Sequence, residues 1–146
     1  MNRATSFLVA LGMLTMMTVL AGCVGAGFGS SGSNLALSSF TGQTYNLSKV
    51  NGNAFDVSER QPTIEFGAEN RISGVICNRF IGQGELTDGV LYVRNMASTK
   101  MVCMNQDLTK FEYTMSHLLM QGATISINNR KLTLRDAETV LEFVRQ

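Results

Sequence analysis

Short alternations of apolar and polar residues, separated by turn signals, constrain the fold of this chain most strongly. Strand side chains point alternately to the two faces of a sheet, so apolar residues at every second position predict half-buried strands. Asn51-Gly52 and Asp88-Gly89 are dipeptides that favour tight reversals between antiparallel strands. The segments with strand-like patterns are 45–47, 64–66, 71–76, 84–86, 90–93, 125–127, 132–134 and 140–144. Antiparallel pairing between neighbours is the simplest consequence.

One segment has helical spacing instead. Its apolar residues recur three or four positions apart, which places them on one face of a helix. They are Leu108, Phe111, Met115, Leu118 and Leu119. Asn105 or Asp107 can cap the start and Gly122 can end it, which predicts a helix of about 14 residues. Since one apolar stripe needs a sheet to cover, we predict an α+β, mainly β fold: a small antiparallel β-barrel-like or sandwich domain with one covering helix.

The N-terminal region has the pattern of an export signal. Arg3 is followed by an uncharged apolar run over 7–20, which is short for a membrane span. The run ends in Leu20-Ala21-Gly22-Cys23, which matches the lipobox of lipoproteins. We therefore expect cleavage before Cys23 and attachment of a lipid to its thiol. An ordinary signal peptide cut elsewhere, or a buried core helix, are the alternatives.

This interpretation divides the chain into three parts. They are a lipoprotein signal peptide over 1–22, a lipidated cysteine with a flexible Gly/Ser-rich tether over 23–39, and a folded domain over 40–146. The lipid would anchor the protein to a membrane. Val24, rather than Asp, follows the lipidated cysteine, so in a Gram-negative source we expect the outer membrane, with the domain facing the periplasm.

The charge balance argues against nucleic acid as a partner. The chain has twelve Lys and Arg, eleven Asp and Glu, and a formal net charge of +1, and removal of Arg3 with the signal peptide makes the two sets equal. Phosphate binding requires an excess of clustered cations, which the sequence lacks. The partners expected are the membrane, through the N-terminal lipid, and an unknown protein or small-molecule ligand. We expect a monomer.

Two cysteines remain once Cys23 carries the lipid. Cys77 and Cys103 would lie outside the cytosol, where disulfides persist, so we predict that they pair. Two buried free thiols are the alternative, because sequence alone does not show that the residues are close.

The sequence contains no readable catalytic, cofactor or metal site. The single histidine, His117, lies within the predicted helix without a neighbouring nucleophile, so a helix-surface position is favoured over a general base or metal ligand. Met101-Val102-Cys103-Met104 offers soft sulfur ligands for Cu(I), but a disulfide and core-filling methionines explain it more simply. We expect no metal and no cofactor.

The acidic residues and one glycine pair also favour structural interpretations. The carboxylates are scattered among turns and polar strand faces, where solvation is favoured over a glycosidase pair. Examples are Glu65, Glu85, Asp88, Glu112, Asp136 and Glu142. Gly82-Gln83-Gly84 resembles a phosphate loop only in glycine content, because no helix follows it. It is interpreted as a bend between two strands.

Two stretches resemble the double signature of the META domain family. They are Ile72-Ser73-Gly74-Val75-Ile76-Cys77-Asn78-Arg79-Phe80-Ile81-Gly82 and Met96-Ala97-Ser98-Thr99-Lys100-Met101-Val102-Cys103. Tyr45-Asn46-Leu47 with Val50-Asn51-Gly52 resembles the start of such domains, and the match continues to Leu132-Thr133-Leu134. Within the family, the chain is most similar to the HslJ-type heat-shock lipoproteins. It departs at Tyr45, where Trp is frequent, at Ile76, where Gly is frequent, and at Lys100, where Arg is usual.

The resemblance implies a compact antiparallel barrel-like or sandwich domain with one helix, heat-shock induction and a link to novobiocin resistance. It implies no enzyme, because the family has no assigned catalytic residues. The motif residues are Gly74, Asn78, Arg79, Phe80, Gly82, Thr99, Lys100 and Met101. Structural roles are favoured for them: backbone bends at the two glycines, a turn at Asn78 and a core position for Phe80. The expected function is therefore non-enzymatic, in stress response and envelope maintenance by binding. An interaction subunit of an envelope or secretion machine is the alternative, and an undetected hydrolase is a weaker one.

Overall fold

The computed structural model describes residues 35–56 and 60–146 of the chain. The predicted signal peptide, Cys23 and most of the predicted tether lie outside the described residues. Leu37–Phe40 forms a 3-10 turn, η1, ahead of the first strand, and Ala68–Asn70 forms a second, η2. No helix in the described ranges combines the length and the apolar character that crossing a membrane requires.

Strands dominate the described residues, and a single α-helix interrupts them. The elements are β1 (Gln43–Val50), β2 (Asn53–Ala54), β3 (Thr63–Phe66), β4 (Arg71–Val75), β5 (Arg79–Thr87), β6 (Val90–Ser98), α1 (Gln106–Gln121), β7 (Ala123–Asn128), β8 (Lys131–Arg135) and β9 (Val140–Arg145). The helix has 16 residues, close to the predicted length. Every segment predicted as a strand lies in one except for Ile76, which follows the end of β4, and β5 and β6 extend well beyond the patterns that indicated them.

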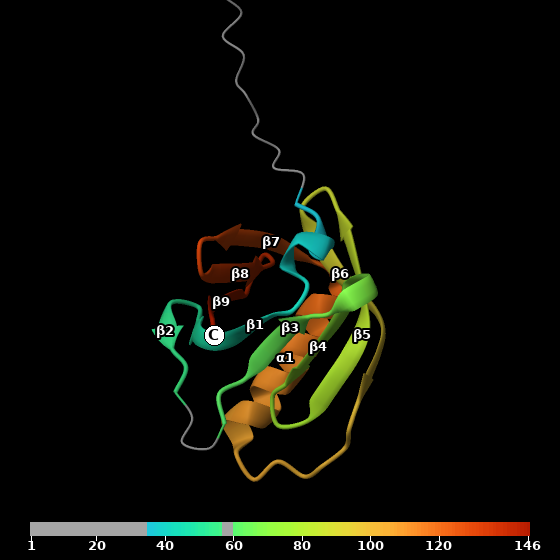
Figure 1. Cartoon of the computed structure of the whole chain (residues 1–146). Helices are drawn as coiled ribbons and strands as arrows, with labels where there is room; N and C mark the ends of the chain where they lie inside the picture. Colours follow the sequence, from blue (N-terminus) through green and yellow to red (C-terminus); the bar gives the residue numbers. More distant parts are fainter. Residues whose placement is uncertain (1–34, 57–59) are drawn as a thin grey trace, which may run out of the picture. The chain divides into compact units, whose positions relative to one another are not determined.

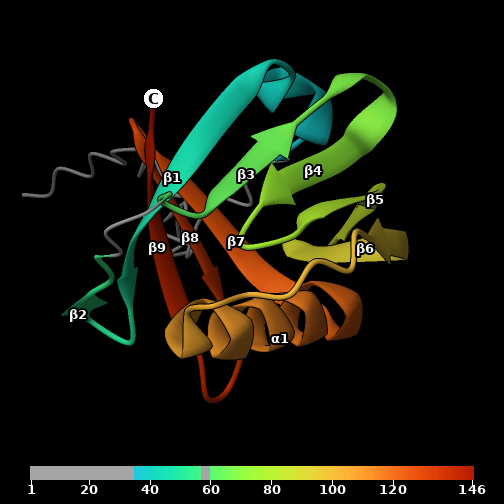
Figure 2. The same ribbon diagram turned by 90° about the horizontal axis from the view of Figure 1, so that it is seen from below.

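Eight of the strands close into an antiparallel barrel. They follow the order β1-β3-β4-β5-β6-β7-β8-β9, and β9 pairs back onto β1. The short β2 pairs only with the end of β1, where Lys49 lies opposite Ala54. Figures 1 and 2 show the strands wrapping around a common interior, with α1 lying across the barrel in the lower part of Figure 2, where the loop between β8 and β9 emerges beneath it. The predicted barrel-like domain with one covering helix is confirmed.

The predicted reversals have the backbone geometry that their residues favour. Asn51 and Gly52 have φ angles of 49° and 79°, and Asp88 and Gly89 have 51° and 77°. Two successive positive φ angles define the turn whose twist matches that of a β-hairpin. Asn, Asp and Gly adopt them at the lowest cost, so these dipeptides fix where β1, β5 and β6 end or begin.

A side chain defines the start of the helix, and the backbone of a glycine defines its end. Asn105 is the N-cap, and its Oδ1 accepts hydrogen bonds from the backbone N–H groups of Asp107 (2.9 Å) and Leu108 (3.2 Å). Gly122 ends the helix at a φ of 108°, and its N–H donates to the Leu118 carbonyl (3.0 Å). Of the two residues that could cap the start, Asn105 therefore does so.

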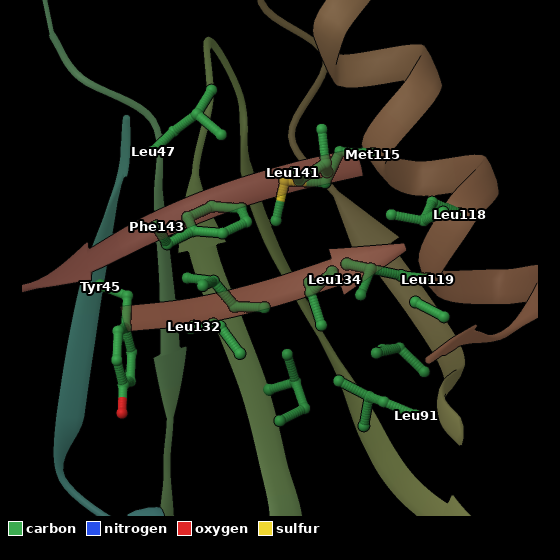
Figure 3. Packing of buried hydrophobic residues seen from close by; sticks show 14 of the residues in the cluster. Tyr45, Leu47, Leu91, Met115, Leu118, Leu119, Leu132, Leu134, Leu141 and Phe143 are labelled. Atoms are coloured by element: carbon green, nitrogen blue, oxygen red, sulfur yellow. The ribbon is translucent and has the colours of Figure 1, made fainter. Parts of the chain in front are cut away.

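The apolar face of α1 completes the core of the barrel. The helical residues at the predicted three- and four-residue spacing are all buried. In Figure 3, Met115, Leu118 and Leu119 point toward strand residues, among them Leu134 and Leu91. Burying a leucine side chain contributes about 1.5 to 3 kcal/mol. The helix is thus held by tertiary packing rather than by propensity alone.

Two glycine predictions need correction. Gly82-Gln83-Gly84 was expected to form a bend between strands, but it lies inside β5. The register shifts there between Ile81 and Gln83, which marks a bulge within the strand rather than a turn. Gly74 was also expected at a bend, but it lies in the extended β4 opposite Phe80. A Cβ at Gly74 would collide with the Thr63 carbonyl and the Phe80 ring, so close packing explains this glycine.

Candidate functional site

Three motif residues from the two signature stretches meet at one end of the barrel. Asn78 lies in the turn between β4 and β5, and Thr99 and Met101 lie in the loop between β6 and α1. We call this loop, residues 99–105, the β6–α1 loop. The motif cluster consists of Asn78, Thr99, Met101, the Cys77–Cys103 pair and Glu112 of α1. It joins three segments that are separate in the sequence.

The side chain of Asn78 is the centre of this cluster. It is the one buried polar residue of the described domain, with 7% of its surface exposed. Its Oδ1 accepts hydrogen bonds from the Met101 N–H (2.7 Å) and the Thr99 hydroxyl (2.8 Å). Its Nδ2 donates to the Met101 carbonyl and to Glu112 Oε2, both at 3.3 Å. One amide therefore ties the β4–β5 turn to the β6–α1 loop and to the helix, and a buried amide with satisfied partners specifies that arrangement.

A disulfide joins the same segments covalently. Cys77 and Cys103 are bonded, with a Cα–Cα distance of 6.0 Å and a sequence separation of 26 residues. Both cysteines are half-buried, and neither lies within a strand. The bond and the Asn78 side chain act on the same two segments, so both restrict the motion of the β6–α1 loop relative to the barrel.

Glu112 is the member of the cluster that sequence reasoning missed. It was expected on a solvated face, but its Oε2 accepts from the Asn78 backbone N–H and from Nδ2, each at 3.3 Å. The prediction of a solvated carboxylate is wrong for this residue. A signal was present, because Glu112 lies four residues after Leu108 and three before Met115, within the apolar spacing of the helix.

The remaining motif residues lie in the core, on the surface or at close contacts between strands, outside the motif cluster. Phe80 is buried beside Gly74. Arg79 and Lys100 have exposed side chains, and the Arg79 backbone is held by two bonds to Thr99, with its N–H donating to Oγ1 (3.1 Å) and its carbonyl accepting from the Thr99 N–H (3.0 Å). Gly82 lies outside the cluster, and a Cβ there would collide with Val93.

Large apolar side chains are exposed beside the motif cluster. The exposed fractions are 63% for Met101, 88% for Val102, 88% for Met104 and 74% for Tyr113. We call these four residues the apolar surface. The methionines were expected to fill core gaps, and that prediction is wrong for Met101 and Met104. In Figures 1 and 2 the β6–α1 loop lies at the end of the described domain away from η1, where the described chain begins.

Two grooves adjoin this end of the domain. One, of about 540 Å³, lies between the β6–α1 loop and α1, and its lining includes Asn78, Met101, Glu112 and Tyr113. A larger one, of about 710 Å³, lies beside the start of α1, and its lining includes Phe55, Asp107 and Lys110. Phe55 packs against Phe111 there, with ring centroids 5.0 Å apart and the ring planes tilted by 41°. Both grooves are open to solvent.

The other residues singled out as possible chemistry lie apart from one another. His117 is exposed and stacks on Tyr113, with centroids 6.1 Å apart. Glu85 pairs with Arg94 and Glu142 with Lys131, each at 3.2 Å. The carboxylate of Asp136 accepts from two backbone N–H groups of its own turn, at 2.8 and 2.7 Å. Asp88 lies in the turn after β5, and Glu65 is exposed on β3. Apart from Glu112, these carboxylates are therefore solvent-exposed or bonded to a neighbouring cation or their own turn.

The fold and this cluster define a class: a small closed antiparallel barrel, covered by one helix and fastened at one end by an asparagine and a disulfide. The META domain family model matches residues 38–146. The chain therefore belongs to the META domain family. It is 37% identical over 97 residues to the heat shock protein HslJ of Escherichia coli (strain K12), an alignment that covers 66% of this chain and 69% of that protein.

Two solved NMR structures are similar to the described fold. One has a TM-score of 0.68 and 33% sequence identity, and the alignment covers 75% of this chain and 94% of that one. The other, a protein from Burkholderia xenovorans, has a TM-score of 0.61 and 22% identity, and covers 76% of this chain and 86% of that one. The second shows a shared fold alone.

Proposed function

We propose that this protein is a membrane-anchored heat-shock lipoprotein that acts by binding another envelope protein rather than by catalysis. The observation that carries the proposal is the apolar surface: three large side chains are exposed on a loop that Asn78 and the disulfide fasten to the barrel, and Tyr113 of α1 is exposed beside them. Contiguous exposed apolar side chains on a soluble domain mark interaction sites. Methionines suit such a surface because their flexible thioether chains adapt to a partner.

The direction of this surface favours a protein partner over the anchoring membrane. The proposed lipid on Cys23 precedes η1 in the chain, while the β6–α1 loop lies at the other end of the described domain (Figure 1). A domain tethered through η1 would thus present Met101, Val102 and Met104 away from its tether. Envelope maintenance under heat stress, with the associated novobiocin resistance, is the physiological role that we propose for this contact.

The test places a photoreactive amino acid at Val102 in the full-length, lipidated protein within its native envelope. A control carries the same amino acid at Ser126, which is exposed on β7. Crosslinks to one or a few envelope proteins from position 102, and few from position 126, are expected. Equal capture at both positions, or lipid adducts alone at position 102, would contradict the proposal.

The first alternative gives a different outcome in the same experiment, and the lining of the larger groove bears on the second. An interaction subunit of an envelope or secretion machine would capture one partner in constant ratio, at normal temperature as well as after heat shock. A hydrolase would need a nucleophile and a base facing a cavity. The described residues lining the 710 Å³ groove include the carboxylates of Asp56 and Asp107 and the Thr114 hydroxyl but neither His nor Cys, so the apolar surface, and not this lining, favours a binding function.

Anchoring has its own test. Cys23→Ala should abolish palmitate labelling and release or stall the protein, while Cys77→Ala should leave labelling intact. Unchanged labelling of the Cys23 variant would exclude this residue as the lipid acceptor. Recovery of the mature protein in the inner-membrane fraction would contradict the outer-membrane location.

A further inference from the structure

Three potential metal ligands converge in the motif cluster. The sulfur atoms of Cys77 and Cys103 and a carboxylate oxygen of Glu112 all lie within 4.8 Å of one another. Glu112 Oε2 is 3.8 Å from Cys103 Sγ. In the disulfide the sulfur atoms carry no charge and hold no proton, so this contact is neither a hydrogen bond nor a metal site. Reduction would change that, because thiolates are strong metal ligands.

The residues around these ligands already orient them. The backbone N–H and Nδ2 of Asn78 both donate to Glu112 Oε2, at 3.3 Å. Nδ2 also lies 3.8 Å from Cys103 Sγ, where it can donate to a thiolate. Hydrogen bonds of this kind fix the direction of metal ligands and stabilise their charge. The carboxylate would therefore keep its position when the sulfur atoms separate.

We propose that reduction of the Cys77–Cys103 disulfide converts the motif cluster into a binding site for Zn²⁺, with the two thiolates and the Glu112 carboxylate as ligands. A dithiol reductant would supply two electrons and two protons, giving two protein thiols and its own disulfide. Binding of Zn²⁺ then releases the two thiol protons. The bound metal would also block re-formation of the disulfide, because both sulfur atoms are engaged.

The ligand set and its access both favour zinc. Two sulfur ligands and one carboxylate leave the fourth tetrahedral position for water, as Zn²⁺ accepts. Grooves reach the ligands from two sides, since Cys103 and Glu112 line the 540 Å³ groove and Cys77 lines another of about 450 Å³. Met101 lines both. Its thioether would suit Cu(I), whereas the carboxylate favours zinc over Cu(I).

The test uses the full-length protein in detergent, reduced with a dithiol and then freed of it under argon. Co²⁺, a spectroscopic substitute for zinc, should give thiolate-to-cobalt charge-transfer absorption that saturates at one equivalent and disappears when Zn²⁺ is added. Glu112→Gln should weaken zinc affinity by at least about tenfold. Glu138→Gln, which changes an exposed glutamate in the turn between β8 and β9, should leave affinity unchanged. The oxidised protein should not respond.

The outcomes separate this proposal from simpler explanations. Should reduction unfold the domain, the titration is followed by recovery of the far-UV signal, because a metal that binds the folded chain stabilises it. If neither the charge-transfer absorption nor the recovery of the far-UV signal is seen, the proposed site is wrong. Equal zinc affinity in the Glu112→Gln and Glu138→Gln variants would remove the carboxylate from it. If Cu(I) displaces the bound zinc and the Glu112→Gln substitution does not change metal binding, the assignment to zinc is wrong.

Discussion

The interior of the barrel and the motif cluster are held together in different ways. The interior depends on a pattern: buried apolar side chains from β1, β9, α1 and the other strands form one core, and chemically similar residues could replace many of them. The cluster depends on individual atoms, since Oδ1 and Nδ2 of Asn78 have separate partners. The barrel thus supplies stability, while the cluster fixes the shape of one loop. Substitutions in the interior should therefore change the stability of the whole domain, whereas substitutions in the motif cluster should act mainly on the β6–α1 loop.

The largest effect is expected in the interior. Phe143 is fully buried on β9, and its neighbour Val144 is 42% exposed. Phe143→Ala should lower the free energy of unfolding by about 3 to 5 kcal/mol, because it removes transfer energy and leaves a cavity. Val144→Ala should change it by no more than about 0.5 kcal/mol. Urea denaturation measures both, and similar losses would contradict the assigned strand register.

The next effect concerns the disulfide. Replacing Cys77 or Cys103 with Ser should cost about 3 to 4 kcal/mol by the chain-entropy model, and each kcal/mol lowers the melting temperature by roughly 4 to 8 °C in a domain of this size. The loss should disappear when the variants and the parent protein are compared under reducing conditions. Alkylation of both thiols under denaturing, non-reducing conditions would show that the cysteines are unpaired.

A smaller loss is expected at Gly74, where the barrel meets the motif cluster. Gly74→Ala should destabilise the domain by about 1 to 3 kcal/mol, because its Cβ would press on the Thr63 carbonyl and the Phe80 ring. The matched control is Ser73→Ala, at the preceding position of β4. Thermal unfolding measures both variants. If Gly74→Ala is as stable as the control, the close approach of Phe80 is not a constraint.

The smallest effect is a pH dependence at Tyr45. Burial raises the pKa of this hydroxyl above its ordinary 10.0, and the Arg145 guanidinium acts in the opposite direction. The folded state therefore disfavours the phenolate, so this contribution to stability is complete below pH 10.0 and is lost as the pH rises through the raised pKa. Tyr45→Phe should flatten the decline by less than about 1.4 kcal/mol per pH unit, the limit for one proton. Chemical denaturation at a series of alkaline pH values measures this, and an equal decline of the unfolding free energy with pH in the parent protein and in Tyr45→Phe would contradict the prediction.

Much of the barrel could be predicted because its signals are local. The alternation of Tyr45 with Leu47, the Asp88-Gly89 turn and the helical spacing after Asn105 each act over a few residues. Closure of β9 onto β1 could not be read in this way, because strand pairing over such a sequence separation leaves no local trace. The predicted bend at Gly74 was wrong for the same reason, because the residue that requires this glycine, Phe80, lies on another strand.

The cluster was harder to predict than the barrel. The resemblance to the META domain family indicated Asn78, Thr99 and Met101, but not what they contact. The role of Glu112 was not predicted, because a single carboxylate in a helix is usually solvated. The exposure of Met101 and Met104 was not predicted, because methionine is usually a core residue. Both depend on the path of the β6–α1 loop, which the partners of Asn78 determine.

Hydrogen exchange of the Asn78→Ala variant tests most directly whether this asparagine holds the β6–α1 loop in place. The control is Asn128→Ala, at the exposed end of β7. We predict that exchange of the Met101 amide, which donates to Asn78 Oδ1 at 2.7 Å, becomes faster by about tenfold, the equivalent of one lost hydrogen bond, while the β8 amides stay as protected as in the control. Unchanged exchange at Met101, or an equal increase across β8, would contradict a local fastening role for Asn78.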